Sequence, residues 1–137
     1  MIKLEINNFI RSSLSLDFLK KIVKKVSAKE KKRSGKVSLA LVDEKTIKKL
    51  NAWYRGENKI TDVLSFALDK PKNFILPTNK ENYLGEIIIC YPQAKKQAKK
   101  LGHSLQKEIE ILFLHGLLHL LGYSHKKMRK DYSEYFH

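Results

Sequence analysis

The sequence has one cysteine, three prolines and no apolar run long enough to span a bilayer. The single cysteine, Cys90, excludes an internal disulfide and favours a reducing compartment. The missing apolar run excludes a transmembrane helix. The first residues also lack the charged-then-apolar pattern of a secretory leader. We therefore expect a cytoplasmic protein that has no membrane partner.

Acidic residues are scarce relative to basic ones. The 137 residues include 28 Lys and Arg against 14 Asp and Glu, which gives a formal net charge of +14. A surface of this charge attracts polyanions, and nucleic acid is the expected partner, ahead of an anionic membrane surface. Lysine enrichment from an AT-rich genome is an alternative explanation of the charge, but it does not explain the histidine pattern described below.

The length of 137 residues predicts one domain over residues 1–137. Hydrophobic periodicity predicts that it is of the α+β class, with a mixed four-stranded sheet covered by about five helices. Strands are expected at residues 2–6, 37–42, 63–68 and 84–91. Helices are expected after Ser15, from Asp43 to Tyr54, from Pro92 to Leu101, after Ser104 and, as a short last one, at 126–137. Residues 69–83 are expected to form a loop. The third and fourth strands can pair directly, which would make the sheet mixed.

Three histidines near the end of the chain have the spacing of a zinc site. His115 and His119 stand one turn apart on the same face of a helix. Gly122 can adopt a left-handed conformation that ends the helix, so His125 can turn back towards them. A single histidine in an apolar run is more often a packed core residue, but this spacing is hard to explain by packing. Three neutral imidazoles form a catalytic-type zinc site with a fourth position for water, and we expect one Zn²⁺ per chain.

The same spacing matches the long zinc motif of metzincin proteases, H-E-x-x-H-x-x-G-x-x-H. Gly116 stands where that motif has the glutamate that serves as general base. A peptidase of that type could not use its standard water-activation step here. A zinc peptidase is therefore the least favoured function.

A second candidate site lies at the end of the second predicted helix. Arg55 suits phosphate recognition, because a guanidinium group grips two phosphate oxygens at once. The neighbouring aromatic rings of Trp53 and Tyr54 can stack on an unpaired base, although core packing is the expected role of Trp53. Arg55 could instead form a structural ion pair with Asp62, whose carboxylate is expected to fix a turn by accepting backbone N–H groups.

In these motifs the chain resembles the bacterial YbeY endoribonucleases, often described as rRNA maturation factors. The resemblance rests on His115-Gly116-x-Leu118-His119-Leu120-x-Gly122-Tyr123-x-His125, Asn51-x-x-Tyr54-Arg55-Gly56, Thr61-Asp62-Val63-Leu64-Ser65-Phe66 and Leu84-Gly85-Glu86-Ile87. It implies a zinc-dependent, single-strand-specific endoribonuclease that matures the 3′ end of small-subunit rRNA and acts in ribosome quality control. The implied partners are the small ribosomal subunit and an assembly GTPase. By motif match, His115, His119 and His125 would bind zinc and Arg55 would be catalytic.

The chain departs from the family pattern at a few positions. Ser124 stands where the family usually has aspartate, which changes the support around a zinc histidine. Ile60 and Ala67 stand where prolines are common.

The hypothesis that follows is metal-assisted hydrolysis of a phosphodiester, with Arg55 stabilising the charge that develops on the phosphoryl group. Glu86 is a candidate proton acceptor, with structural pairing as its alternative, and the lysines at 95–100 would hold the RNA backbone. His103 is expected to be exposed and without a role. The main alternative is a non-catalytic rRNA-binding assembly factor whose zinc is structural.

Overall fold

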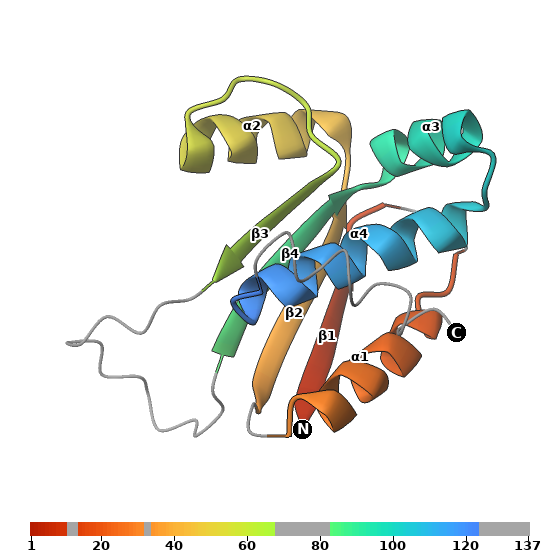
Figure 1. Cartoon of the computed structure of the whole chain (residues 1–137). Coiled ribbons are helices and arrows are strands. Elements are labelled where there is room, and N and C mark those ends of the chain that lie inside the picture. The colour runs from red at the N-terminus through yellow and green to blue at the C-terminus, as the bar shows by residue number, and fades with distance from the viewer. Residues whose placement is uncertain (11–13, 32–33, 68–82, 124–137) are drawn as a thin grey trace.

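The computed structural model describes residues 1–10, 14–31, 34–67 and 83–123. Along the chain the elements are β1 (Ile2–Asn8), α1 (Phe18–Lys29), β2 (Gly35–Val42), α2 (Glu44–Arg55), β3 (Val63–Ala67), β4 (Tyr83–Cys90), α3 (Tyr91–Leu101) and α4 (Leu105–Leu120) (Figure 1). This order of strands and helices confirms the prediction. The expected helix at 126–137 and nearly all of the expected loop at 69–83 lie outside the described residues.

The four strands form one mixed sheet in the order β1-β2-β4-β3. β1 pairs parallel to β2, β2 pairs parallel to β4, and β3 pairs antiparallel to β4. Direct pairing of β3 with β4 confirms the mixed sheet and the α+β class. β3 is an edge strand, and this position decides where the candidate site forms.

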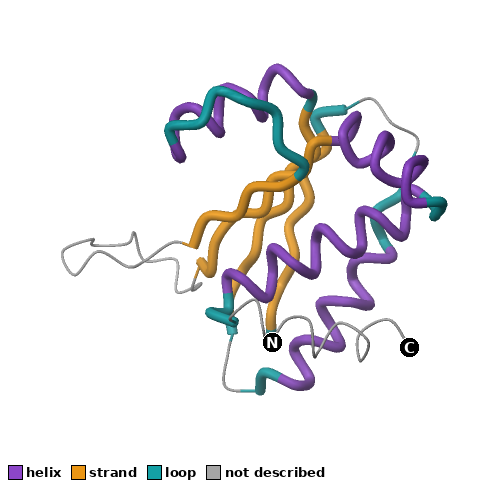
Figure 2. The backbone as a smooth tube through the Cα atoms, turned by 45° about the horizontal axis from the view of Figure 1, so that its top comes forward, coloured by secondary structure: helices purple, strands orange, loops and turns teal. Residues whose placement is uncertain are grey.

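Helices lie on both faces of the sheet (Figure 2). On one face α1 and α4 bury the larger core, which includes Val37, Leu39 and Leu41 of β2 and Ile87 and Ile89 of β4. On the other face α2 covers a smaller cluster of Val42, Ile47, Leu64, Ile88 and Cys90. The run Ile87–Ile89 is therefore buried from both sides, because successive residues of a strand point to opposite faces.

Side-chain caps fix the starts of α2 and α4, at the positions where the sequence predicts these helices to begin. Asp43 Oδ1 accepts a hydrogen bond from the Thr46 backbone N–H at 2.8 Å. Hydrogen bonding to the Thr46 side chain, and then to its backbone N–H, lowers the pKa of the Asp43 carboxyl. Ser104 Oγ accepts from the Lys107 backbone N–H at 3.1 Å. At the end of α4, Gly122 has φ +86°, which is the predicted left-handed conformation. The chain therefore turns directly after the helix that carries His115 and His119.

Two glycines let α4 and β3 approach β4 closely. A Cβ atom at Gly116 would lie 2.9 Å from Ile87 Cγ2. A Cβ atom at Gly85 would overlap the backbone oxygen of Phe66 in β3 and lie 2.8 Å from Leu120 Cδ2. Interiors are close-packed, so neither position has space for a larger residue without movement of its neighbours. These close contacts hold the last turns of α4 against β4 and next to the edge strand β3.

The described part of the chain contains no helix long and apolar enough to cross a membrane.

Candidate active site

His115 and His119 form an open stripe on the second half of α4, where the other residues are buried. His115 is half-buried and His119 is exposed. From position 112 to 120 all the other residues are buried: Leu112, Phe113, Leu114, Gly116, Leu117, Leu118 and Leu120. The two imidazoles therefore stand on the side of α4 that faces away from the core, one turn apart as predicted. The alternative of a packed core histidine does not describe His119.

The ring of His119 is oriented by a side chain from the edge strand. Ser65 Oγ of β3 and His119 Nδ1 lie 3.2 Å apart, and 54 positions separate the two residues in the sequence. A neutral imidazole whose Nδ1–H donates to a hydroxyl carries its lone pair on Nε2, the nitrogen that a metal ion would take. A hydrogen bond of this kind fixes both the tautomer and the ring orientation of a metal-binding histidine.

Ser65 was not among the residues that the sequence assigned to a role. The sequence does contain a pattern that could have identified Ser65. It is a polar residue between Leu64 and Phe66, and both of these neighbours point to the α2 face of the sheet. Strand parity then places Ser65 on the α4 face, next to the histidines.

The third predicted ligand, His125, lies outside the described residues, as does Ser124. Within the described ranges no group of three or more His, Cys, Asp and Glu side chains could hold a metal ion. The structure therefore brings together two of the three predicted ligands, His115 and His119. The chain turns at Gly122, directly after the helix that carries them.

Arg55 is the last residue of α2 and its side chain is exposed. The helix ends at Gly56, where φ is +70°. The following segment is tied back to α2, because the buried Asn51 donates from Nδ2 to the backbone oxygen of Lys59 at 2.9 Å. In the described ranges no ion pair joins Arg55 to Asp62. Arg55 is thus presented to solvent at a fixed helix end.

Asp62 uses its carboxylate differently from the prediction. It accepts a hydrogen bond from the Thr61 hydroxyl at 3.4 Å and, with the Gln97 amide turned to donate, one from Gln97 at 3.3 Å. The same amide donates to Glu108 at 3.1 Å. Glu108 is buried at 3% exposure and also contacts the imidazole of His103. His103 is therefore not the exposed residue that the sequence suggested: it is a half-buried member of a network that joins α3, α4 and the start of β3.

Three aromatic rings extend from the sheet edge to solvent at the end of α2. Tyr54 and Phe66 have ring centroids 4.5 Å apart at 44°, and Trp53 and Tyr54 have centroids 5.5 Å apart at 29°. Trp53 is 80% exposed, so the prediction that it packs in the core is wrong.

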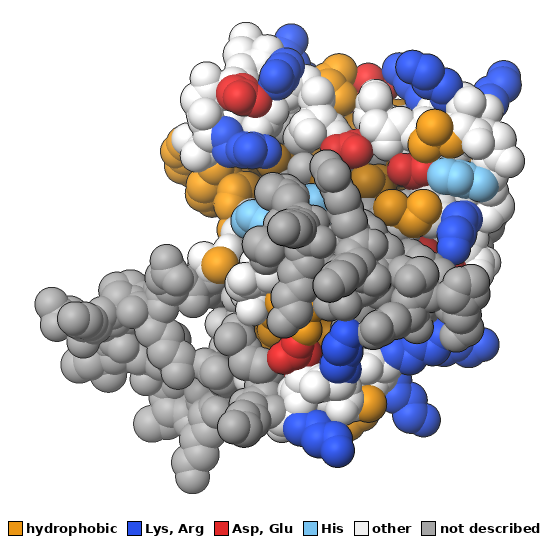
Figure 3. Space-filling model, in the orientation of Figure 1, with side chains coloured by type: hydrophobic (Ala, Val, Ile, Leu, Met, Phe, Trp, Pro, Cys, Tyr) orange, Lys and Arg blue, Asp and Glu red, His pale blue; other side chains and the backbone are white. Residues whose placement is uncertain are grey.

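Consecutive residues of the edge strand β3 contact the aromatic rings and His119. Phe66 contacts Tyr54 on one face of the strand, and Ser65 contacts His119 on the other. In Figure 1 the final turns of α2 and α4 lie on the same side of the molecule and flank β3. In the space-filling view, histidine atoms lie beside the apolar side chains exposed there (Figure 3). The predicted metal-binding and phosphate-binding elements therefore meet at one edge of the sheet.

Comparison with known proteins identifies the family. A family model described as Endoribonuclease YbeY matches residues 3–136 of this chain. The chain belongs to the YbeY endoribonuclease family. The Endoribonuclease YbeY of Persephonella marina is 39% identical over 119 residues, which cover 87% of this chain and 75% of that protein.

Further relatives support this assignment. The Endoribonuclease YbeY of Desulforamulus reducens is 47% identical over 91 residues, which cover 66% of this chain and 60% of that protein. The solution structure of TM1509 from Thermotoga maritima is similar with a TM-score of 0.66 and 30% identity, and the match covers 98% of this chain and 86% of that one. The YbeY match extends across both the edge-strand motif and the histidine motif.

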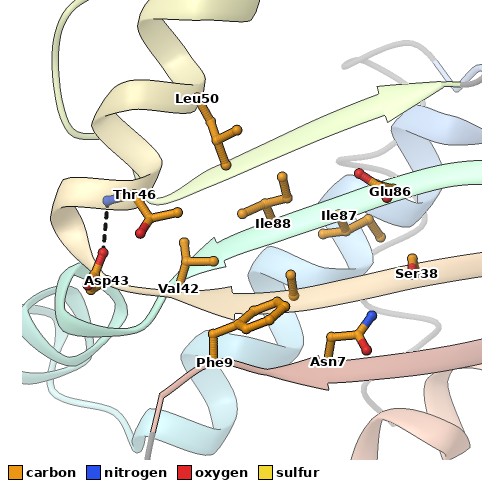
Figure 4. Close-up of a pocket in the computed structure, with 11 residues that line it drawn as sticks. Asn7, Phe9, Ser38, Val42, Asp43, Thr46, Leu50, Glu86, Ile87 and Ile88 are labelled. Carbon is orange, nitrogen blue, oxygen red and sulfur yellow. Dashed lines mark hydrogen bonds between the residues drawn. The ribbon is translucent and has the colours of Figure 1, made fainter.

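In this YbeY family member, Glu86 lies away from the histidines. It lines a groove on the α2 face of the sheet together with Asn7, Ser38 and Ile88 (Figure 4). Its strand neighbour Ile87 packs in the core that contains α4. Glu86 and the histidine helix are therefore on opposite faces of the sheet, and the role of Glu86 as a proton acceptor stays a prediction.

The lysines of α3 are also distant from the histidines. In Figure 1 α3 lies beside the first part of α4, whereas His119 stands 14 positions after Leu105, which is roughly 21 Å along the helix axis. Lys96 forms an ion pair with Glu44 at 3.6 Å, and Lys95 lies over the ring of Tyr91 at 5.7 Å. The lysines of α3 and the two histidines therefore lie at different ends of α4.

Proposed function

We propose that this chain is a zinc-dependent endoribonuclease that cleaves single-stranded RNA. We further propose that it acts in the cytoplasm on the 3′ end of small-subunit rRNA and in ribosome quality control, with the small subunit and an assembly GTPase as partners. The observation that carries the proposal is the pair His115 and His119 on the open stripe of α4, with His119 oriented by Ser65. The net charge of +14 suits a polyanionic substrate.

The donor set of the described residues fits a zinc ion. Imidazole is a common zinc ligand, and two of them separated by four residues on a helix are a recurrent arrangement. His115 and His119 would hold the ion, and His125 would complete the set of three. Zinc bound by three imidazoles supplies a nucleophile at neutral pH, because it lowers the pKa of bound water to about 7. Ser65 would keep the ring of His119 in the orientation that binding requires.

Arg55 would bind the substrate phosphate. Its position at the exposed end of α2, next to the edge strand, leaves the guanidinium able to reach a strand of RNA that crosses β3. The guanidinium would grip two phosphoryl oxygens and stabilise the negative charge that develops on them, an effect worth about 3 kcal/mol for comparable donors.

The zinc peptidase alternative receives no support from the position of Gly116. A side chain there would be directed at Ile87 in the core, since a Cβ atom would meet three Ile87 side-chain atoms at 2.9 to 3.3 Å. A glutamate at this position would enter the core before it could serve as general base. The helix therefore has neither the residue nor the space for the peptidase step.

The non-catalytic alternative, an assembly factor with a structural zinc, uses the same residues and requires an experiment. Zinc-loaded protein is incubated with an end-labelled single-stranded RNA, with the matching duplex and with casein, each with and without a chelator. We expect cleavage of the single-stranded RNA alone, loss of that cleavage with chelator, and recovery when zinc is added back.

Two variants assign the roles in that assay. Arg55→Ala should bind zinc normally and remain folded while losing cleavage, and His119→Ala should lose zinc measured by elemental analysis. Leu101→Ala is the matched control, because Leu101 is 64% exposed at the far end of α3. Zinc binding without any RNA cleavage would refute the nuclease proposal and support the non-catalytic assembly factor with a structural zinc.

A further inference from the structure

The aromatic rings at the end of α2 have a use that the metal site does not explain. Trp53, Tyr54 and Phe66 form an aromatic ladder in which each ring contacts the next, with centroid separations of 5.5 and 4.5 Å. Phe66 is partly buried against the smaller core, so it anchors the ladder to the sheet. Exposure rises outward, to 59% for Tyr54 and 80% for Trp53.

From this arrangement we infer that the aromatic ladder is a stacking platform for a nucleobase of the RNA substrate, next to the scissile phosphate. The inference rests on the proposed function and adds to it the element that recognises unpaired bases. A base presents a flat π-face to an aromatic ring whatever its sequence, but only when it is not already paired and stacked in a duplex. The platform would therefore select single strands without reading their sequence.

The surroundings of the ladder favour a nucleotide as the occupant. Arg55 follows Tyr54 directly in the chain and offers a cation for the phosphate attached to a stacked base. On the other side, Phe66 is the strand neighbour of Ser65, whose hydroxyl contacts His119. An RNA strand that stacks a base on the ladder and continues across the edge strand would thus pass Arg55 on one face of β3 and His119 on the other. The positive net charge of the chain adds attraction for the RNA backbone.

The position of Trp53 gives a direct reporter, because it is the only tryptophan in the chain. Metal-stripped protein, which keeps cleavage out of the measurement, is titrated with a short single-stranded RNA, the same RNA as a duplex, and an abasic ribose-phosphate strand of equal length. We expect the single-stranded RNA to quench the tryptophan fluorescence. The abasic strand and the duplex should bind more weakly and leave the fluorescence nearly unchanged.

Variants locate the effect on the ladder. Binding by the variants is measured by the fluorescence anisotropy of a dye-labelled RNA, because replacing Trp53 removes the only tryptophan. Trp53→Leu and Tyr54→Leu should each weaken binding of the single-stranded RNA by roughly five- to 150-fold, the range expected for loss of one stacked base. Both variants should leave binding of the abasic strand unchanged, and Trp53→Phe should restore most of the affinity. Leu101→Ala, at an exposed apolar residue away from the ladder, serves as the control, and circular dichroism verifies that each variant is folded.

The outcomes separate this inference from the proposed function. Equal affinity for the RNA and the abasic strand, with no change in Trp53→Leu, overturns the platform and indicates that the exposed rings bind something other than a base. Base-dependent binding without zinc-dependent cleavage would support the platform while refuting the nuclease.

Discussion

Replacing Gly116 with alanine tests how closely α4 is seated on the sheet. In an exposed helix interior this change stabilises by about 1 kcal/mol, because glycine is the poorer helix former. At position 116 the new methyl group would lie 2.9, 3.2 and 3.3 Å from three side-chain atoms of Ile87. Overpacking of a well-packed core costs about 1 to 3 kcal/mol. The expected net result is a loss of up to about 2 kcal/mol in the free energy of unfolding.

A double-mutant cycle isolates the contact. Ile87→Ala removes all three atoms that crowd the methyl group and on its own should cost about 2 to 5 kcal/mol. In that background Gly116→Ala should become stabilising, because the methyl group fills part of the cavity. The coupling energy should fall at about 1 to 3 kcal/mol. Urea unfolding followed by circular dichroism suits this cycle, since the sole tryptophan is 80% exposed and reports poorly on the core.

The result also bears on the absent glutamate. If Gly116→Ala stabilises the protein by about 1 kcal/mol and shows no coupling to Ile87, the result contradicts the close packing of α4 against β4. A glutamate at 116 would then be tolerated, and the structural argument against the peptidase would be lost. Gly116→Glu provides the stronger version: we expect severe destabilisation, because it forces a carboxylate towards an apolar core.

Three further predictions concern single side chains. Ser65→Ala should leave the fold intact but weaken zinc binding, measured by competition with a chelating dye, by about tenfold or more, and an unchanged Kd would remove its orienting role for His119. Burial raises the pKa of the Cys90 thiol, so a thiol reagent at neutral pH should label it only after unfolding, and rapid labelling of the native protein would contradict its burial. Because the pKa of the Asp43 carboxyl is lowered, the carboxylate stabilises the fold at neutral pH, and this stabilisation is lost as the pH falls through the lowered pKa. Asp43→Asn should therefore make the free energy of unfolding depend less on pH in the acid range. Ser104→Ala should lower the free energy of unfolding equally at all pH values.

Features set by neighbouring residues could be predicted from the sequence. The caps at Asp43 and Ser104 and the left-handed Gly122 depend on side chains and backbone within one helical turn. The pairing of β3 with β4 followed from their proximity in the chain. The face shared by His115 and His119 followed from helical periodicity alone.

Features set by tertiary arrangement could not be predicted in the same way. Strand parity places Ser65 on the α4 face, but its contact with His119 joins two residues 54 positions apart and depends on how α4 packs beside β3. The residue type of Trp53 favours burial, but its position on α2 leaves the ring beyond the sheet edge. Glu86 shows the opposite case: strand parity with the buried Ile87 could have placed it on the far face, once helices were expected on both sides of the sheet.

The most direct test of the account is a zinc titration of metal-stripped protein against a labelled single-stranded RNA. We predict that cleavage is absent without metal, rises with added zinc and reaches a plateau at one equivalent per chain, and that His119→Ala shows neither the binding nor the cleavage. Cleavage by the metal-stripped protein at the rate of the zinc-loaded protein would contradict the account.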